Sequence, residues 1–204
     1  MREISEAARQ SGKLEAIRKA AIRVFAVKGY HEATVSEIAA EADVGKGTVY
    51  FYYASKEDIL LAILEYHFDQ MIGLIEQIEE LDVDPALATR MIVRDTIRRL
   101  EADPDLFKIM QQQPLLYHER VKERFEVLFE QMVERIERVL RAGIDAGVLR
   151  SFDPRVAASV LLNIAASVPL YLSLYKDRPQ ERLLDHLADE LGDLVWAALR
   201  QPDR

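Results

Sequence analysis

A helical repeat of apolar residues continues along almost the whole chain and limits what it can fold into. The longest stretch lies between Tyr117 and Ala146, where apolar residues recur every three or four positions and form one stripe. The members of this stripe are Phe125, Leu128, Phe129, Met132, Ile136, Val139, Leu140 and Ile144. No segment shows the apolar and polar alternation, bounded by turn residues, that is typical of a β-strand. The sequence therefore predicts an all-α fold.

Prolines, glycines and capping residues divide this pattern into about nine helices. Asp84-Pro85, Asp103-Pro104 and Asp153-Pro154 each combine an N-cap residue with a proline suited to the first helical position. Gly29 and Gly147 are suited to left-handed helix ends. The predicted helices are 11–28, 34–42, 46–53, 55–81, 85–102, 104–113, 117–146, one that begins after Asp153, and 180–199.

The charged residues are unevenly distributed. The chain of 204 residues has a net charge of −8. Residues 1–56 nevertheless contain nine Lys or Arg against seven Asp or Glu, whereas residues 57–204 contain 18 against 28. The first quarter of the chain can therefore approach a phosphate backbone, and the remainder would be repelled by one. This asymmetry favours two regions with different roles.

The segment from Val156 to Tyr175 contains 20 residues without a charge, which is long enough to span a membrane. Serines, Asn163 and Pro169 dilute its apolar character, and its alanines allow close helix packing. We therefore interpret it as a helix buried in the protein or against a second subunit, with no membrane partner. The first 12 residues are charged and lack an apolar core, and the chain has no cysteine, so we expect a cytoplasmic protein without disulfides.

The segment Thr34–Lys56 contains two short predicted helices separated by the turn Asp43-Val44-Gly45. This spacing is typical of a helix-turn-helix unit, whose second helix can enter the major groove of B-DNA. The residues expected to pack together and fix the angle between the two helices are Ile38, Ala39, Val44 and Val49.

The opposite face of the second helix is expected to contact DNA. Lys46 can donate to guanine or to a phosphate, Gly47 permits close approach of the backbone, and Phe51 can contact thymine methyl groups. Hydroxyls and Lys56 are suited to phosphate contacts. The predicted DNA-binding residues are Thr34, Ser36, Lys46, Gly47, Thr48, Tyr50, Phe51, Tyr52 and Lys56. In the alternative interpretation the aromatic residues build a small core, although 46–53 has more aromatic surface than a core of this size needs.

Residues 14–64 closely resemble the DNA-binding domain of TetR-family repressors. The similarity is carried by Phe25, Lys28-Gly29-Tyr30, Thr34-Val35-Ser36-Glu37-Ile38-Ala39, Lys46-Gly47-Thr48-Val49-Tyr50 and Ser55-Lys56-Glu57. Two residues depart from the family pattern. Asp43 stands where glycine is usual, and Asp tolerates a left-handed backbone. Gly45 stands where a capping Ser or Thr is usual, and glycine is a weaker but acceptable N-cap.

The resemblance implies a homodimer on a palindromic DNA operator, with a DNA-binding domain at 1–54 and a ligand-binding and dimerisation domain at 55–204. In this family the eighth and ninth helices form the subunit interface. The apolar stripes that fit this role are Ala157, Leu161, Ala165 and Val168, and Leu183, Leu184, Leu187, Leu191, Leu194 and Val195. Either stripe could instead pack within one subunit.

The resemblance also implies a small effector, held between the fourth and eighth helices, that draws the recognition helices out of half-site spacing. The candidate apolar lining residues are Phe68, Met71, Ile75, Phe107, Met110, Tyr117, Phe125, Phe129 and Met132, each of which could also be ordinary core. Arg94 and Arg98 belong to an arginine stripe on 85–102 that could bind the phosphates of coenzyme A, or form a solvated face paired with Asp95 and Glu101.

The segments 29–31 and 56–60 are similar to those of the fatty-acid-degradation repressors in the TetR family, which respond to long-chain acyl-CoA. A long-chain acyl-CoA is therefore the preferred effector, and a different hydrophobic or drug-like molecule is the alternative. The sequence does not indicate an enzyme, a metal site or a cofactor. Its four histidines lack metal-ligand spacing, and it has no glycine-rich phosphate loop and no nucleophile elbow. A helical scaffold that binds only proteins is a third possibility, and it predicts no affinity for DNA.

Overall fold

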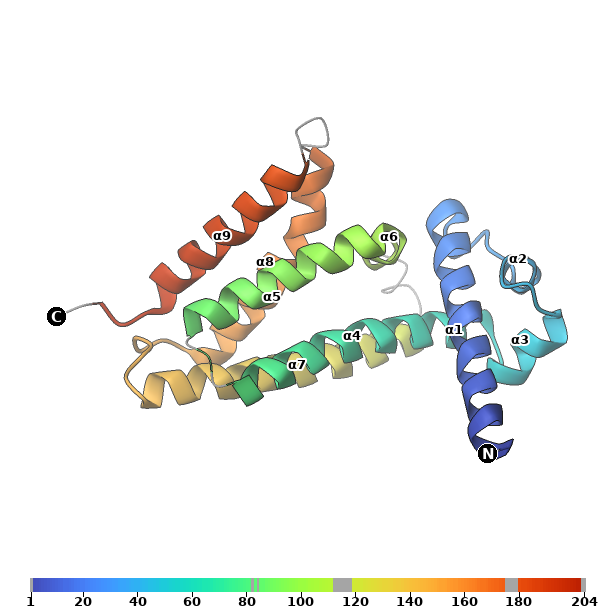
Figure 1. Ribbon diagram of the computed structural model, residues 1–204, viewed down its shortest axis with the longest axis horizontal. Helices are drawn as coiled ribbons and strands as arrows, with labels where there is room; N and C mark the ends of the chain where they lie inside the picture. The colour runs from blue at the N-terminus through green and yellow to red at the C-terminus, as the bar shows by residue number, and fades with distance from the viewer. Residues whose placement is uncertain (1, 82, 84, 112–118, 175–179, 203–204) are drawn as a thin grey trace. The chain divides into compact units, whose positions relative to one another are not determined.

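The computed structural model describes residues 2–81, 83, 85–111, 119–174 and 180–202. In this part of the chain the fold is all-α, as predicted, and a single isolated β-bridge joins Leu149 to Arg200 (Figure 1). The helices are α1 (Arg2–Lys28), α2 (Val35–Glu41), α3 (Lys46–Tyr52), α4 (Lys56–Leu81), α5 (Pro85–Ala102), α6 (Pro104–Gln111), α7 (Glu119–Asp145), α8 (Pro154–Leu174) and α9 (Gln180–Leu199).

The predicted capping residues begin the helices as expected. Thr34 and Glu37 form a complete capping box at the start of α2. The hydroxyl of Ser55 accepts a hydrogen bond from the amide of Asp58 at 3.1 Å. A carboxylate oxygen of Asp153 accepts hydrogen bonds from the amides of Arg155 and Val156. Local hydrogen bonding therefore determines where α2, α4 and α8 begin.

One predicted boundary was wrong: α1 begins at Arg2, not near Ser11. Its first turns contain alanine, glutamate and arginine, which are strong helix formers. Gly12 lies inside the helix, where a Cβ would meet no atom within 4 Å. The ends predicted for α6 (residues 112 and 113) and the start predicted for α7 (residues 117 and 118) lie outside the described residues.

The chain divides into two compact units, residues 1–67 with 104–126 and residues 68–103 with 127–204. α4 and α7 therefore each contribute residues to both. The predicted DNA-binding domain, 1–54, lies wholly within the first unit. That unit also contains the first part of α4, α6 and the start of α7. The functional boundary at residue 54 stays a prediction.

The core of the first unit forms where α1 packs against α2 and α6. Its fully buried side chains come from α1, α2 and α4 and include Ile17, Phe25, Ile38, Ile59, Leu60, Ile63 and Leu64. The guanidinium of Arg18 lies 3.4 Å from the centre of the Tyr66 ring, so a cation–π contact adds to this packing. α2 packs against α1, and α3 in turn packs against α2.

In the second unit α5 lies beside α9 (Figure 1). Val93 and Ile97 on α5 pack with Ala188 on α9, and Leu187 and Leu191 pack against this cluster. Leu187 and Leu191, predicted for the subunit interface, pack partly against α5 of the same chain, and their role in an interface stays a prediction. Val195 is also buried within the chain, Leu194 is exposed, and the side chains of Leu183 and Leu184 lie outside the description.

A candidate nucleic-acid interface

The turn between α2 and α3 has the backbone that its two unusual residues predict. Asp43 has a φ of 53°, in the left-handed region that Asp tolerates. Gly45 is the N-cap of α3, and no side-chain hydrogen bond caps this helix. The amide of Val44 donates to the carbonyl of Ala39 at 3.0 Å, which ties the turn back to α2.

The inner faces of α2 and α3 are apolar and pack together. Ile38 and Ala39 on α2 and Val49 on α3 are buried, as predicted from the helix-turn-helix spacing. Val44 in the turn is half-buried. These contacts leave the opposite face of α3 free to meet a partner.

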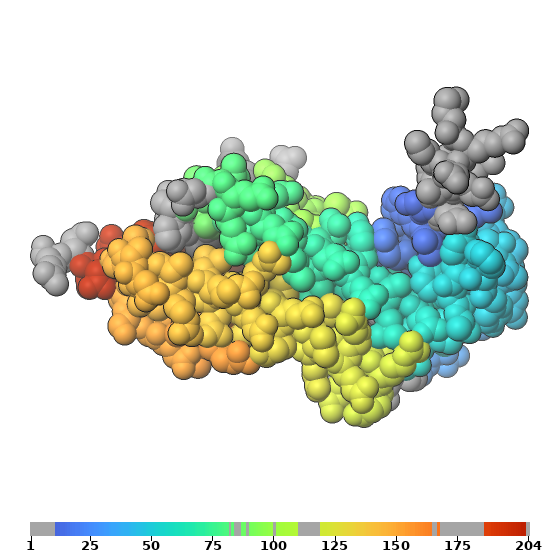
Figure 2. Space-filling view, turned by 90° about the horizontal axis from the view of Figure 1, so that it is seen from below, coloured from blue at the N-terminus to red at the C-terminus, as the bar shows by residue number. Residues whose placement is uncertain are grey.

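That outer face of α3 presents aromatic rings and a cation to solvent. Phe51 is 77% exposed and Tyr50 is 48% exposed. Lys46 and Gly47 are exposed as well, and the ammonium nitrogen of Lys46 lies 5.9 Å from the centre of the Tyr50 ring. Thr48, Tyr52 and Tyr53 are half-buried. The alternative in which the aromatic residues serve only as core therefore does not hold for Phe51 or Tyr50. In Figure 2 the helix-turn-helix segment, in light blue and cyan, forms part of the visible surface.

The cations near this face differ in how they are paired. Arg23 on α1 forms an ion pair with Glu41 on α2 at 2.6 Å, and Lys28 pairs with Glu37. Lys46 forms no ion pair with any residue that the structure describes, so its positive charge is available to an anionic partner. The candidate contact of Lys46 with a base or a phosphate is thus compatible with the geometry.

The other predicted phosphate contacts lie at the starts of α2 and α4. Ser36 is exposed. The hydroxyl of Thr34 accepts a hydrogen bond from the Glu37 amide and donates one to the Glu37 carboxylate. Lys56 differs from what was expected, because its ammonium donates to three backbone carbonyls of its own unit. Lys56 therefore has no free N–H group in this structure for the predicted phosphate contact.

Sequence reasoning missed this internal role of Lys56. Its three acceptors lie 26, 25 and 23 residues earlier in the chain. They are backbone carbonyls, which no residue type identifies. Helical spacing carries no signal for such a contact.

The predicted effector-binding residues fall in both units. Phe68, Ile75 and Met132 are buried in the second unit, where Met71 and Phe129 are half-buried. Phe107 is buried and Phe125 half-buried in the first unit. The side chain of Met110 and all of Tyr117 lie outside the described residues. A ligand role for this set stays a prediction.

The arginine stripe of α5 is paired largely with α9. Arg94 forms an ion pair with Asp189 at 2.7 Å, and Arg90 pairs with Asp193. Arg99 pairs with Asp95, as the solvated alternative predicted, but the pairing proposed with Glu101 is not found among the described contacts. Arg98 is exposed and has no ion pair within the described part of the chain.

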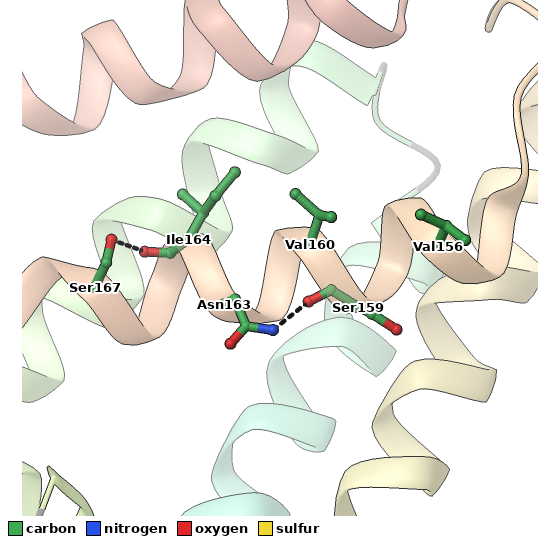
Figure 3. A pocket seen from close by; sticks show the side chains of 6 residues that line it. All are labelled: Val156, Ser159, Val160, Asn163, Ile164 and Ser167. Atoms are coloured by element: carbon green, nitrogen blue, oxygen red, sulfur yellow. Dashed lines mark hydrogen bonds between the residues drawn. The ribbon is translucent and has the colours of Figure 1, made fainter.

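A shallow groove of about 490 Å³ runs along α8 (Figure 3). Val156, Val160 and Ile164 form one row along it, and Ser159, Asn163 and Ser167 form a second row. Val156 is 60% exposed and Val160 is 52% exposed. Of the interface residues predicted on α8, Ala157 and Leu161 are half-buried, whereas the side chains of Ala165 and Val168 are outside the description.

Within the described residues, no cluster of three or more His, Asp or Glu side chains could hold a metal ion. The same residues include no helix with the length and apolar character that a membrane span requires.

Comparison with known proteins identifies the helix-turn-helix part of the chain. Residues 17–63 match the family described as bacterial regulatory proteins, tetR family. The chain is 28% identical over 146 residues to the fatty acid metabolism regulator protein of Bacillus subtilis (strain 168). That match covers 70% of this chain and 74% of the relative.

Two solved structures share the fold over nearly the whole chain. The fatty acid degradation regulator FadR from Bacillus halodurans superposes with a TM-score of 0.80 at 23% identity, covering 93% of this chain and 97% of that one. The transcriptional regulator FadR from Bacillus subtilis, in complex with stearoyl-CoA, superposes with a TM-score of 0.79 at 22% identity, covering 90% and 98%. Residues 17–63 therefore match the helix-turn-helix part of the tetR family, and the chain shares the all-α fold of these two regulators.

Proposed function

We propose that this protein is a dimeric transcriptional repressor that places one α3 helix in each half of a palindromic DNA operator. The observation that carries the proposal is the outer face of α3. There Lys46 has no carboxylate partner among the described residues, and Phe51 is 77% exposed. Phe51 and the neighbouring Tyr50 together expose aromatic surface beside this cation, and such a surface is suited to binding a partner.

The residues of this face fit the chemistry of a major groove. The ammonium of Lys46 can donate to guanine O6 and N7 or to a phosphate, and the ring of Phe51 can pack on thymine methyl groups. The hydroxyl of Tyr50 suits a phosphate oxygen, which fixes register but carries no sequence information. Gly47 lacks a side chain, so the backbone of α3 can approach the bases closely. Thr34, Ser36, Thr48 and Tyr52 would complete the contacts.

Dimerisation is supported by the groove on α8. Its two valines, Val156 and Val160, are exposed in the single chain. Two of its polar side chains donate hydrogen bonds within the helix. Asn163 donates to the carbonyl of Ser159 at 2.8 Å, and Ser167 donates to that of Ile164 at 2.7 Å (Figure 3).

A second copy of the chain could cover the row of valines without breaking these two hydrogen bonds. We therefore assign α8 to the subunit interface. α9 would contribute only residues that α5 leaves uncovered, such as Leu194, which is 65% exposed.

A long-chain acyl-CoA is the effector that we propose. Support comes from the relative named a fatty acid metabolism regulator and from the stearoyl-CoA complex of the structurally similar FadR. In this chain the apolar residues Phe68, Ile75 and Met132 would line the acyl-chain site. Arg98 is the better candidate for the coenzyme A phosphates, because Arg94 is already paired with Asp189. A different hydrophobic effector is the alternative.

Release of DNA needs only a difference in affinity. An acyl-CoA that binds the DNA-incompetent form more tightly shifts the population away from the operator. By linkage, the operator must weaken acyl-CoA binding by the same factor. We expect this regulation to take place in the cytoplasm, where the DNA is.

The proposal is tested by selecting duplexes from a random DNA library with the wild-type protein and measuring binding to the selected duplex. We expect a palindromic sequence that Phe51→Ala no longer binds tightly. Recovery of no sequence preference would overturn the DNA-binding proposal and favour a scaffold that binds only proteins.

The effector is tested on the same duplex with lauroyl-CoA, free coenzyme A and laurate added separately. Release by lauroyl-CoA alone supports recognition of both the chain and the head group. Arg98→Ala should then need more lauroyl-CoA, whereas Arg141→Ala, an exposed arginine on α7, should respond as the wild type does. Binding that persists with all three additives would remove the acyl-CoA proposal and leave the alternative effector.

A further inference from the structure

The side chain of Lys56 closes a contact between the start of α4 and the turn that joins α1 to α2. Its ammonium nitrogen lies 2.6 Å from the carbonyl oxygen of Tyr30, 3.0 Å from that of His31 and 2.8 Å from that of Ala33. An ammonium group has three protons and no acceptor, so these three carbonyls use its full capacity.

The turn held by Lys56 is itself well packed. Gly29 begins it with a φ of 79°, and the amide of Ala33 donates to the Gly29 carbonyl at 3.2 Å. The Tyr30 ring is buried and meets Phe25 edge-on, with ring centres 5.4 Å apart. The ammonium nitrogen of Lys56 also lies close to the Tyr30 ring, 4.5 Å from its centre.

This turn leads directly into the capping box of α2, and α2 carries the turn to α3. A shift of the 30–33 backbone relative to α4 therefore changes where α2, and with it α3, is held. Lys56 is the first residue of α4, and its side chain links the start of this helix to the 30–33 backbone.

We propose that Lys56 is a positioning residue for DNA binding: it fastens the first turn of α4 to the 30–33 backbone and so holds the helix-turn-helix unit in its binding geometry, without touching a phosphate. This inference rests on the proposed DNA-binding function. Burial lowers the pKa of Lys56, and Glu32 partly opposes this effect, as expected for an ammonium group that is turned inward.

An arginine cannot replace this contact. Its guanidinium is a planar fork, suited to carboxylates and phosphates, whereas the compact ammonium of lysine can direct three protons to three converging carbonyls. Lys56→Arg therefore separates the two possible roles. It would preserve a phosphate contact and would break the contact with the 30–33 backbone.

The test measures affinity for the duplex selected by the wild-type protein, from about 50 to about 200 mM salt. Lys56→Met, Lys56→Arg and Lys46→Met are compared with the wild type, and circular dichroism shows that each is folded at the temperature used. A phosphate contact contributes about 0.9 to the slope of log affinity against log salt concentration.

We expect Lys56→Met and Lys56→Arg each to bind about tenfold more weakly or worse, with the salt slope of the wild type. Lys46→Met should lose part of the slope if Lys46 contacts a phosphate. Amide hydrogen exchange within residues 30–34 should also accelerate in both Lys56 variants, because the contact that holds the turn is gone.

A reduced salt slope in Lys56→Met, with affinity restored in Lys56→Arg, would assign Lys56 to a phosphate and overturn the inference. Wild-type affinity in both folded Lys56 variants would show that the contact does not position the binding surface, and would leave the proposed function intact. If the wild type itself selects no DNA, the proposed function fails and this inference fails with it.

Discussion

Glu37 joins the end of α1 to the start of α2 through Lys28, which donates a hydrogen bond to one of its carboxylate oxygens. The second oxygen accepts hydrogen bonds from the amide and the hydroxyl of Thr34, both at 3.0 Å. These contacts, the one with Lys28 above all, lower the pKa of Glu37 from 4.5 to about 2. One exposed carboxylate thus serves both as the capping residue of α2 and as the link between two helices.

This shift predicts how stability depends on pH. Above pH 4.5 Glu37 is ionised in both the folded and the unfolded protein, so its full contribution to the free energy of unfolding is present. As the pH falls from 4.5 towards about 2, the unfolded state takes up the proton first, and the free energy of unfolding loses this contribution. We expect Glu37→Gln to lower the urea midpoint at pH 7 and to flatten its decline over that range.

Glu134 offers a matched control, because it is exposed on α7 and forms no ion pair with a described residue. Urea midpoints of Glu134→Gln should follow those of the wild type at every pH. A Glu37→Gln variant whose midpoints decline as steeply as those of the wild type would show that Glu37 does not link α1 to α2 through its charge.

Neighbouring residues on α3 allow stability and DNA binding to be separated. Val49 is fully buried, whereas Phe51 is 77% exposed. Val49→Ala removes buried methyl groups and should lower the free energy of unfolding by about 1–3 kcal/mol. Phe51→Ala should change that free energy by less than about 0.5 kcal/mol, since its ring touches little of the fold.

DNA binding by Phe51→Ala should nevertheless weaken, by roughly 1–3 kcal/mol if the ring contacts a base. Denaturant unfolding and binding to the selected duplex measure the two effects. A destabilised Phe51→Ala, or one that binds DNA as the wild type does, would contradict the assignment of this ring to the binding surface.

Local signals were sufficient to predict most helix ends. Thr34, Ser55 and Asp153 each hydrogen-bond to the first turn of their own helix, so the sequence around each residue contains the whole interaction. The start of α1 was missed because Ser11-Gly12 has the composition of a helix start. The residues before it favour helix strongly enough to include Gly12, which costs about 0.5–1 kcal/mol relative to alanine.

Long-range contacts were not predictable in the same way. The period of apolar residues identified an apolar stripe on α9, but not that Leu187 and Leu191 pack against α5 of the same chain while Leu194 is exposed. Arg94 and Asp189 are 95 residues apart, and nothing in the spacing of α5 alone identifies that partner. The face of α3 was predictable because the helix-turn-helix spacing places its buried side, and so leaves the other side outside.

Two glycines that lie inside helices differ in their surroundings. A Cβ on Gly192 in α9 would lie 2.5 Å from Cγ of Arg90 on α5, whereas a Cβ on Gly73 in α4 would meet nothing within 4 Å. Gly192→Ala should therefore push α5 away from α9 and destabilise the protein by about 1–3 kcal/mol. Gly73→Ala should stabilise it by up to about 1 kcal/mol, because alanine favours the helix.

Thermal unfolding followed by circular dichroism compares the two variants directly. If Gly192→Ala melts at or above the temperature of the wild type, the close approach of α5 and α9 at this position is not required.

The exposed valines of α8 test where two chains meet. Val160 is 52% exposed in the single chain, so Val160→Asp should leave the fold of one subunit intact. In a dimer that buries this face, each subunit would place an unpaired carboxylate in an apolar contact, which is strongly unfavourable. The dimer dissociation constant should rise by about 100-fold or more, measured by sedimentation equilibrium.

The control is Val27→Asp, which changes a valine that is 78% exposed on α1 and should leave the mass of the sedimenting species unchanged. Because one subunit alone can reach only one half-site, the monomeric Val160→Asp should also lose tight binding to a palindrome while keeping weak binding to a single half-site. If Val160→Asp sediments as a dimer at the concentrations at which the wild type is dimeric, α8 does not form the interface.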